Sequence, residues 1–398
     1  MSIQVGNPFG HAFEVMGRVP QVVTDEVNSG AFEALNEALV LGADGLGKMV
    51  VLRAASAGFG KTHLLARVER SLEETHLFIP LQPVKGKELD ANSVLYAVLQ
   101  RFLHALPENE GLTVLDLLAR RLFAFGLKPL VSSGEVPCES SESVLWALQT
   151  QPVQILDFYS ESAVTARWVK ENFELLRPRL ADELVGCVRS NACSIGWWLD
   201  VLFSYSVASA DDLSERGSAL FDVVFSGVDT EAHLCDRLLG LLNLLGLVTS
   251  PVLVLDETEG FSNDVDMALE VVLLLNTLHQ SCDRLAVVVS VNDDVWQEGF
   301  APCLSSGLED RLSDVVIGLE PMGREEAVKM LCSRVGEMMG KAVAKKLSWK
   351  GEVLCARGVM RAAAKVWSDV VQEKGEQLGA INVTSKPESS IDSPFSKG

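Results

Sequence analysis

The segment from Ala55 to Thr62 constrains the fold of this chain more than any other. It reads Ala-Ser-Ala-Gly-Phe-Gly-Lys-Thr and lies between a short apolar run, 49–52, and a stretch with helical periodicity, about 62–72. Small residues let successive backbone N–H groups turn inward around an anion, and the following helix directs its positive end to the same place. The pattern matches Walker A with Ala in the first glycine position. It predicts a strand–loop–helix unit that binds nucleotide phosphates.

Within this motif, Lys61 is expected to reach the β- and γ-phosphates, and the Thr62 hydroxyl to bind Mg²⁺. The alternative is a glycine-rich strand–helix turn with a chance Gly-Lys-Thr. A similar segment from Gly42 to Met49 precedes a strand and ends without a hydroxyl, so we expect Lys48 to be a solvated turn residue. The residues predicted to contact the nucleotide are Ala55, Ser56, Ala57, Gly58, Phe59, Gly60, Lys61, Thr62 and His63.

A second motif begins with the apolar run 252–255 and ends in Asp256 and Glu257. A carboxylate at the end of a buried strand can hold Mg²⁺ through water, which is the role predicted for Asp256. Glu257 is placed to polarise the attacking water as a general base, with Glu259 as a weaker candidate. Two acids after an apolar run also occur at ordinary solvated strand ends. The upstream phosphate motif favours the nucleotide interpretation.

Three further residues are candidates for the same site. Asn292 ends the next apolar run, 285–291, where it could bridge the γ-phosphate and the attacking water or simply cap the following helix. Arg311 could stabilise phosphate charge from a neighbouring subunit, or form a surface ion pair with Glu309 or Asp310. Arg361 could reach back to the nucleotide, or be one more exposed arginine of a helix.

The order of these motifs resembles the AAA+ P-loop ATPases, in their origin-recognition-like and STAND-like branch. The layout is also similar to that of ATPases of bacterial phage-exclusion systems, as a fold-level analogy. The resemblance implies an α/β fold with a P-loop core, a parallel sheet and a C-terminal helical lid, and it implies ATP and Mg²⁺ as ligands. It assigns Asn292 as sensor 1, Arg311 as arginine finger and Arg361 as sensor 2.

Lys61 and Asp256 are 195 positions apart, whereas a compact core needs only a few strand–helix units between them. We therefore expect a helical insertion at 93–247 between two parts of the core, 1–92 and 248–322. A lid at 323–375 and a disordered tail at 376–398 would follow. The insertion holds Trp146, Trp168, Trp197 and Trp198, which either fill its own core or form a surface for a protein partner.

Composition limits the class of protein. The 398 residues are 48% hydrophobic with a net charge of −20, which is ample for a large core and unsuited to general nucleic-acid binding. The 323–374 region is an exception: eleven Lys and Arg against six Asp and Glu leave it basic. That surface could contact DNA, dock a subunit, or be an ordinary solvated face.

The expected environment is a reducing cytoplasm. The eight cysteines have no C-x-x-C pair or zinc spacing, and the first residues lack the pattern of a secretory signal. The uncharged stretch 238–255 approaches membrane-spanning length but contains Asn243 and Pro251. A buried helix, a turn and a buried strand explain it better than a membrane span.

We expect an ATP-hydrolysing molecular switch that acts on a protein or DNA partner, with homo-oligomerisation left open. A second hypothesis is a nucleotide-gated scaffold with little turnover, whose insertion holds a protein partner. A small-molecule kinase fits less well, because Glu257 suits water activation better than transfer to a bound acceptor.

Overall fold

The computed structural model describes residues 7–9, 24, 27–40, 45–83, 88–106, 111–208, 213–227, 230–349 and 354–384. The described part is an α/β fold with one five-stranded sheet in the order β2-β3-β4-β1-β5, and all neighbouring strands are parallel. The expected α/β class and parallel sheet are therefore confirmed. The strands are β1 (Met49–Ala54), β2 (His76–Leu81), β3 (Ser250–Leu255), β4 (Ala286–Asn292) and β5 (Val315–Leu319).

Side chains that point alternately to the two faces of the sheet divide the core into two layers. In β1, Met49 and Val51 belong to one apolar cluster, while Val50, Leu52 and Ala54 belong to another on the opposite face. Successive side chains of a strand point to opposite faces, so a strand that is apolar throughout is buried on both sides. The short apolar runs of the sequence are therefore the central strands of a covered sheet.

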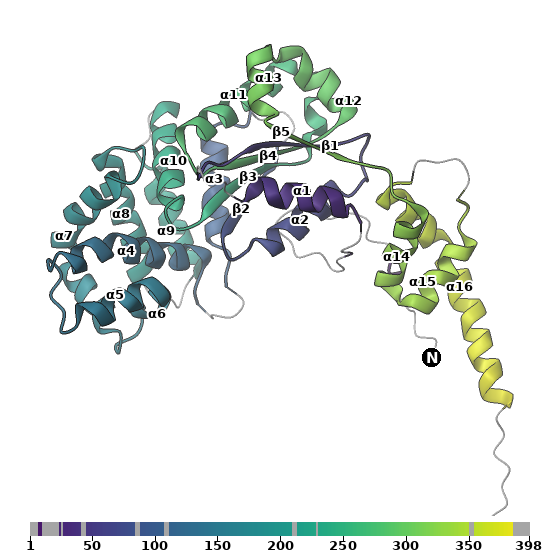
Figure 1. Cartoon of the computed structure of the whole chain (residues 1–398), viewed down its shortest axis with the longest axis horizontal. Helices are drawn as coiled ribbons and strands as arrows, with labels where there is room; N and C mark the ends of the chain where they lie inside the picture. Colours follow the sequence, from purple (N-terminus) through teal and green to yellow (C-terminus); the bar gives the residue numbers. More distant parts are fainter. Residues whose placement is uncertain are drawn as a thin grey trace, which may run out of the picture.

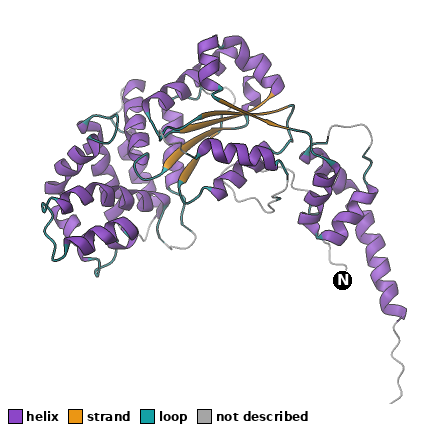
Figure 2. Cartoon of the chain, viewed as in Figure 1, coloured by secondary structure: helices purple, strands orange, loops and turns teal. Residues whose placement is uncertain are grey.

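Helices cover both faces of the sheet, as Figures 1 and 2 show. On one face, α1 (Ser29–Leu39) and α2 (Lys61–Ser71) pack Leu35, Leu64 and Val68 against the strands. On the other face lie α3 (Ala91–Phe102) and α11 (Val265–Ser281). The crossover from β1 through α2 precedes β2, which pairs with β3 rather than with β1.

Every described element between β2 and β3 is a helix except one isolated bridge, Ala105 with Thr113. The buried apolar residues of these helices form one continuous cluster with a face of the sheet. Trp198 is fully buried there, whereas Trp146 is 59% exposed. After α3 the helices are α4 (Val114–Ser132), α5 (Ser141–Thr150), α6 (Pro152–Ile155), α7 (Val164–Val185), α8 (Ala192–Val207), α9 (Leu213–Phe225) and α10 (Glu231–Leu245).

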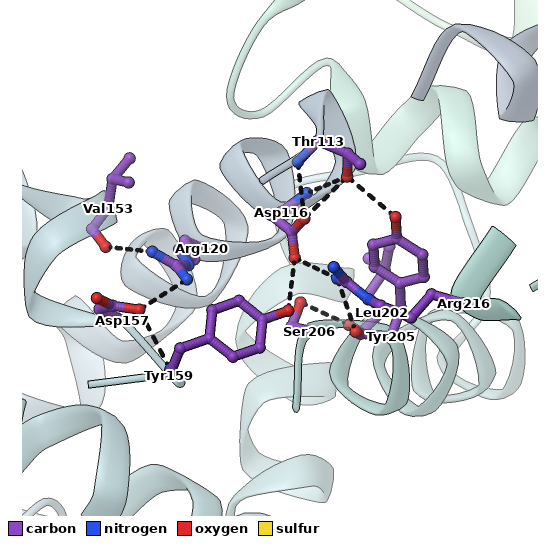
Figure 3. Close-up of polar contacts among 10 residues, drawn as sticks. All are labelled: Thr113, Asp116, Arg120, Val153, Asp157, Tyr159, Leu202, Tyr205, Ser206 and Arg216. Atoms are coloured by element: carbon purple, nitrogen blue, oxygen red, sulfur yellow. Dashed lines mark hydrogen bonds and ion pairs between the residues drawn. The ribbon is translucent and has the colours of Figure 1, made fainter. Parts of the chain in front are cut away.

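A buried polar network holds these helices together (Figure 3). Thr113 caps α4, and Asp116 in the first turn accepts hydrogen bonds from the Thr113 backbone N–H and hydroxyl, both 2.9 Å. The same carboxylate contacts Arg216 of α9 at 2.6 Å and the Tyr159 hydroxyl at 3.4 Å. Burial, reinforced by the Asp116 charge, raises the pKa of Tyr159. A fully buried charge is tolerated because it is paired and multiply hydrogen-bonded.

The uncharged stretch 238–255 is the end of α10, a turn and β3, as the sequence predicted. Across the described ranges, no helix combines the length and the apolar character that crossing a bilayer requires. The eight cysteines are all free thiols.

A short element, η1 (Thr258–Asn263), lies between β3 and α11. The chain connects β4 to β5 through α12 (Asp293–Val295), η2 (Trp296–Phe300), η3 (Ala301–Cys303) and α13 (Ser306–Leu312). Beyond β5 lie α14 (Arg324–Val335), α15 (Glu337–Lys346) and α16 (Ala356–Thr384), at the opposite end of the molecule from α4–α9 (Figure 1). Helix α16 continues to Thr384, so the predicted start of a disordered tail at 376 falls inside a helix. Residues 385–398 lie outside the described residues.

The three C-terminal helices have their own apolar cluster, and residues near the N-terminus complete it. Phe9 is 1% exposed and packs edge-on against Trp367 of α16, with ring centroids 5.5 Å apart. Val27, just before α1, belongs to the same cluster. The N-terminal residues were predicted to belong to the core part at 1–92, and the packing of Phe9 and Val27 on the C-terminal helices was not predicted.

Candidate functional site

The loop 55–62 connects β1 to α2 and contains two residues in the left-handed region, Gly58 at φ 99° and Gly60 at φ 95°. A side chain at either position would be strained, which explains the glycines. Gly60 is the N-cap of α2, and no side chain caps that helix. The first N–H groups of α2 therefore remain available to an anion. Phe59 is 4% exposed and anchors the loop in the core under the sheet.

Polar side chains from the ends of two strands meet the start of α2 at this loop. Parallel strands β3 and β4 are neighbours, so Asp256 after β3 and Asn292 at the end of β4 share one edge of the sheet. Thr62 Oγ1 donates a hydrogen bond of 2.7 Å to Asp256 Oδ2, and Lys61 Nζ donates to Asn292 Oδ1. Both acceptor residues are buried. The 55–62 motif is thus in direct contact with the polar residues at the ends of β3 and β4.

The charge of Lys61 is balanced between opposing influences. Burial lowers its pKa, the Asp256 and Glu259 carboxylates oppose that shift, and the Arg357 guanidinium adds to it. The ammonium is thus partly shielded from water and faces two carboxylates and one guanidinium.

Lys61, Thr62, Asp256 and Glu259 line a pocket of about 210 Å³ that also has walls from the C-terminal helices, whereas Phe59 and Asn292 do not belong to its lining. Met330 and Arg334 of α14 and Arg357 and Met360 of α16 face it from that side. The Arg357 backbone N–H donates to the Gly58 carbonyl at 3.0 Å, which joins α16 directly to the loop. The pocket therefore lies between the sheet edge and a separately packed group of helices.

Two acids after β3 reach the pocket differently. Glu257 is exposed, has a left-handed backbone (φ 58°, ψ 46°) and lines the pocket. Glu259 in η1 also lines it, and its Oε1 accepts a hydrogen bond of 3.2 Å from Asn292 Nδ2. The residue that sequence analysis ranked second is the one tied to the polar cluster.

The remaining predicted residues separate into two groups. His63, Ala57, Gly58 and Gly60 line the pocket, whereas Ala55 and Ser56 are exposed in the loop outside its lining. Arg311 on α13 and Arg361 on α16 are both exposed and do not belong to the lining. The arginines that line it are Arg334 and Arg357.

The segment Gly42 to Met49 was expected to hold no phosphate site. Residues 41–44 lie outside the described residues. Lys48 is half-buried and lies 3.7 Å from the Asp314 carboxylate, away from the pocket lining. Its surroundings are those of a surface residue.

The donor set fits a magnesium ion shared with phosphate. Among the described residues no cluster of three or more His, Cys, Asp or Glu could hold a metal on protein ligands alone. Mg²⁺ commonly takes only one or two protein oxygens and completes its shell with water and substrate phosphates. The Thr62 hydroxyl and Asp256 carboxylate, in contact at 2.7 Å, are such a pair.

Sequence reasoning missed Asn28 and Arg357. Asn28 Nδ2 donates to the Phe59 carbonyl at 3.1 Å and lines the pocket from the N-cap of α1. Its left-handed backbone, φ 55°, is typical of Asn, but an Asn-Ser-Gly sequence alone indicates only a turn or helix start. Arg357 differs from Arg361 by one helical turn, and no local pattern distinguishes the two.

A comparison with models of protein families found no match, and neither did a comparison with curated proteins. The chemistry of the pocket is therefore the guide to its ligand.

Proposed function

We propose that this protein is an ATP-dependent molecular switch that binds Mg²⁺·ATP in the pocket between loop 55–62 and the C-terminal helices and hydrolyses it. The observation that carries the proposal is the convergence of Lys61 and Thr62 with Asn292 and Asp256. A lysine, a hydroxyl and a carboxylate at an uncapped helix start form the set that phosphoryl-transfer sites use. A family assignment to the AAA+ P-loop ATPases belongs to this proposal.

Each residue has a role that follows from its chemistry. The amides of loop 55–62 and α2 would hold phosphate oxygens, and Lys61 would exchange its contact with Asn292 for the γ-phosphate. Thr62 and Asp256 would hold Mg²⁺, which neutralises charge that builds on the phosphates. Asn292 would then be free to orient the attacking water.

The switch would depend on movement of α14–α16 relative to the sheet edge, because these two parts form opposite walls of the pocket. In this proposal α14–α16 are the lid, because they contribute Met330, Arg334 and Arg357 to the pocket while keeping a separate apolar cluster. A bound triphosphate attracts the lid arginines, and its hydrolysis removes that attraction. We expect the hydrogen bond from Arg357 to Gly58 to be the contact that changes most when the triphosphate is hydrolysed.

Titration of Mg²⁺·ATP into wild type and Lys61→Ala tests the proposal. We expect Lys61→Ala to bind about 10–100-fold more weakly, because charge-assisted hydrogen bonds contribute about 1.5–3 kcal/mol. Lys48→Ala is the matched control, since Lys48 lies outside the pocket lining and belongs to the similar segment before β1. Equal affinity in wild type and Lys61→Ala would contradict the proposal.

A second candidate is a nucleotide-gated scaffold with little turnover. It is favoured by apolar side chains on the helices between β2 and β3 that remain exposed, such as Trp146, Val164 and Leu175 at 59%, 66% and 76%. These side chains would mark a partner-binding surface if they belonged to one contiguous apolar patch. Phosphate release by wild type at the rate of buffer alone, with ATP bound, would favour the scaffold over the switch.

A DNA partner has less support. In the basic C-terminal helices, Lys341 pairs with Glu337 at 2.5 Å and Lys346 with Glu373 at 2.6 Å. Paired lysines are typical of a solvated surface, and their partner carboxylates offset the positive charge that would attract DNA phosphates.

A further inference from the structure

Two glutamates follow Asp256, and only one of them is joined to the polar cluster of the pocket. Both glutamates are exposed, and within the described residues Glu257 makes no hydrogen bond or ion pair. Glu259 Oε1 accepts a hydrogen bond from Asn292 Nδ2 at 3.2 Å. Asn292 in turn accepts from Lys61. A continuous chain of hydrogen bonds therefore links Glu259, and not Glu257, to the lysine of the loop.

The direction of this chain follows from the chemistry of its members. An ammonium has only donors, so Lys61 must meet the amide oxygen of Asn292. That contact turns the amide N–H₂ group of Asn292 to the opposite side, where a carboxylate is the fitting acceptor. Glu259 occupies that position. The contact with Lys61 thus fixes the orientation of the Asn292 amide, and Glu259 is the acid that accepts its hydrogen bond.

The backbone around Glu259 is well anchored. Thr258 Oγ1 donates to the Ser290 carbonyl of β4 at 2.9 Å, which ties the start of η1 to the sheet. Two residues beyond Glu259, Phe261 is fully buried and packs against Phe300 with ring centroids 5.4 Å apart. An acid on such a rigid support keeps a defined position relative to its neighbours.

We propose that Glu259, rather than Glu257, is the general base that activates the attacking water. This inference rests on the proposed ATPase function and names a residue for its chemical step. The water oxygen forms a bond to the γ-phosphorus while the bond from that phosphorus to the β,γ-bridging oxygen breaks. The electron pair of the broken bond stays with ADP, and Glu259 accepts one proton of the water. Glu257 lines the pocket without a hydrogen bond to Asn292.

Matched variants test this assignment: Glu257→Gln and Glu259→Gln, with wild type, in ATP titration and in single-turnover phosphate release. We expect both variants to bind ATP within about twofold of wild type, which also shows that they fold. Loss of a general base costs about 10²–10⁴-fold in rate, so Glu259→Gln should lose at least about 100-fold. Glu257→Gln should retain clearly more activity than Glu259→Gln, because Glu257 makes no hydrogen bond to Asn292.

A conservative variant separates proton transfer from a merely structural role. Glu259→Asp keeps a carboxylate and should recover part of the rate that Glu259→Gln loses. Loss of activity in Glu257→Gln alone, equal losses in both glutamine variants, or no recovery of rate in Glu259→Asp would overturn the inference. So would ATP binding by wild type without turnover, although the nucleotide site would then stand. Absence of ATP binding by wild type would remove the proposed function itself.

Discussion

Thr62 Oγ1 and Asp256 Oδ2 are 2.7 Å apart, although 194 positions separate the two residues in the chain. The contact forms because α2 begins beside the edge of the sheet at which β3 ends. A hydroxyl and a carboxylate in this position are the two protein ligands that a phosphate-bound Mg²⁺ needs. The helices between β2 and β3 enlarge the sequence separation without moving either group out of the pocket.

The first prediction concerns this pair. Thr62→Ala removes one of the two magnesium ligands, so its ATP affinity should no longer increase when Mg²⁺ is added. Thr62→Ser keeps the hydroxyl and should retain the Mg²⁺ dependence of wild type. Titrations of ATP with Mg²⁺ and with EDTA measure the difference. Identical Mg²⁺ dependence in Thr62→Ala and Thr62→Ser would argue against the proposed metal position.

The two arginines of α16 should differ in function. Arg357 lines the pocket and its backbone contacts Gly58, whereas Arg361 is exposed one turn further along. We expect Arg357→Ala to weaken ATP binding about tenfold or more, as for the loss of a charge-assisted contact. Arg361→Ala should bind like wild type. The opposite result would restore the role that the family resemblance assigns to Arg361.

Gly58 should tolerate no side chain. At φ 99°, a Cβ would be strained, and it would lie 2.7 Å from Arg357 Cβ. Gly58→Ala should therefore separate α16 from the loop and reduce ATP affinity, with a stability cost of about 1–3 kcal/mol. Gly307→Ala is a suitable control, because nothing lies within 4 Å of a Cβ there and no positive φ is required. Unchanged ATP affinity in Gly58→Ala would be inconsistent with close packing of α16 on the loop.

The buried pair of Asp116 and Arg216 should matter for stability and not for nucleotide binding. Their side chains are 0% and 3% exposed and meet at 2.6 Å, so removal of either partner leaves a buried charge unpaired. We expect Arg216→Met to lose about 3–5 kcal/mol of unfolding free energy. Glu337→Gln, which breaks an exposed pair with Lys341, should unfold at the same denaturant concentration as wild type. Denaturant unfolding measures both variants.

His76 should make stability depend on pH. Burial lowers its pKa, and its hydrogen bond to the Leu39 carbonyl opposes that only in part. The unfolded chain takes up a proton at the ordinary histidine pKa, about 6.5, while the folded protein resists until lower pH. Stability contributed by neutral His76 is thus complete above about pH 6.5 and is lost as pH falls toward the lowered pKa. His76→Gln should show a smaller loss of unfolding free energy between about pH 8 and pH 5 than wild type.

The strands and the phosphate loop could be predicted from the sequence because their signals are local. Short apolar runs marked β1, β3 and β4, and each is buried on both faces. The placement of Asp256 beside Asn292 followed from the rule that parallel strands end at one edge. The full strand order is not local: β2 pairs with β3 across all the intervening helices. Nothing in either strand's composition specifies that partner.

The C-terminal side of the pocket could not be predicted for the same reason. Whether Arg357 or Arg361 reaches the pocket depends on how α16 is docked against Gly58, which is a tertiary contact. No sequence pattern around Phe9 predicts that it packs on Trp367. The preference between Glu257 and Glu259 likewise depends on the orientation of the Asn292 amide, which the sequence does not encode in any neighbouring residue.

The most direct test of the central claim is a crystal structure of the protein with Mn²⁺ and a non-hydrolysable ATP analogue. Mn²⁺ replaces Mg²⁺ and can be located by its anomalous scattering. The account predicts the metal beside Thr62 and Asp256, with the γ-phosphate in contact with Lys61 and the phosphate chain along residues 57–62. A nucleotide bound elsewhere, or a metal away from Thr62 and Asp256, would contradict it.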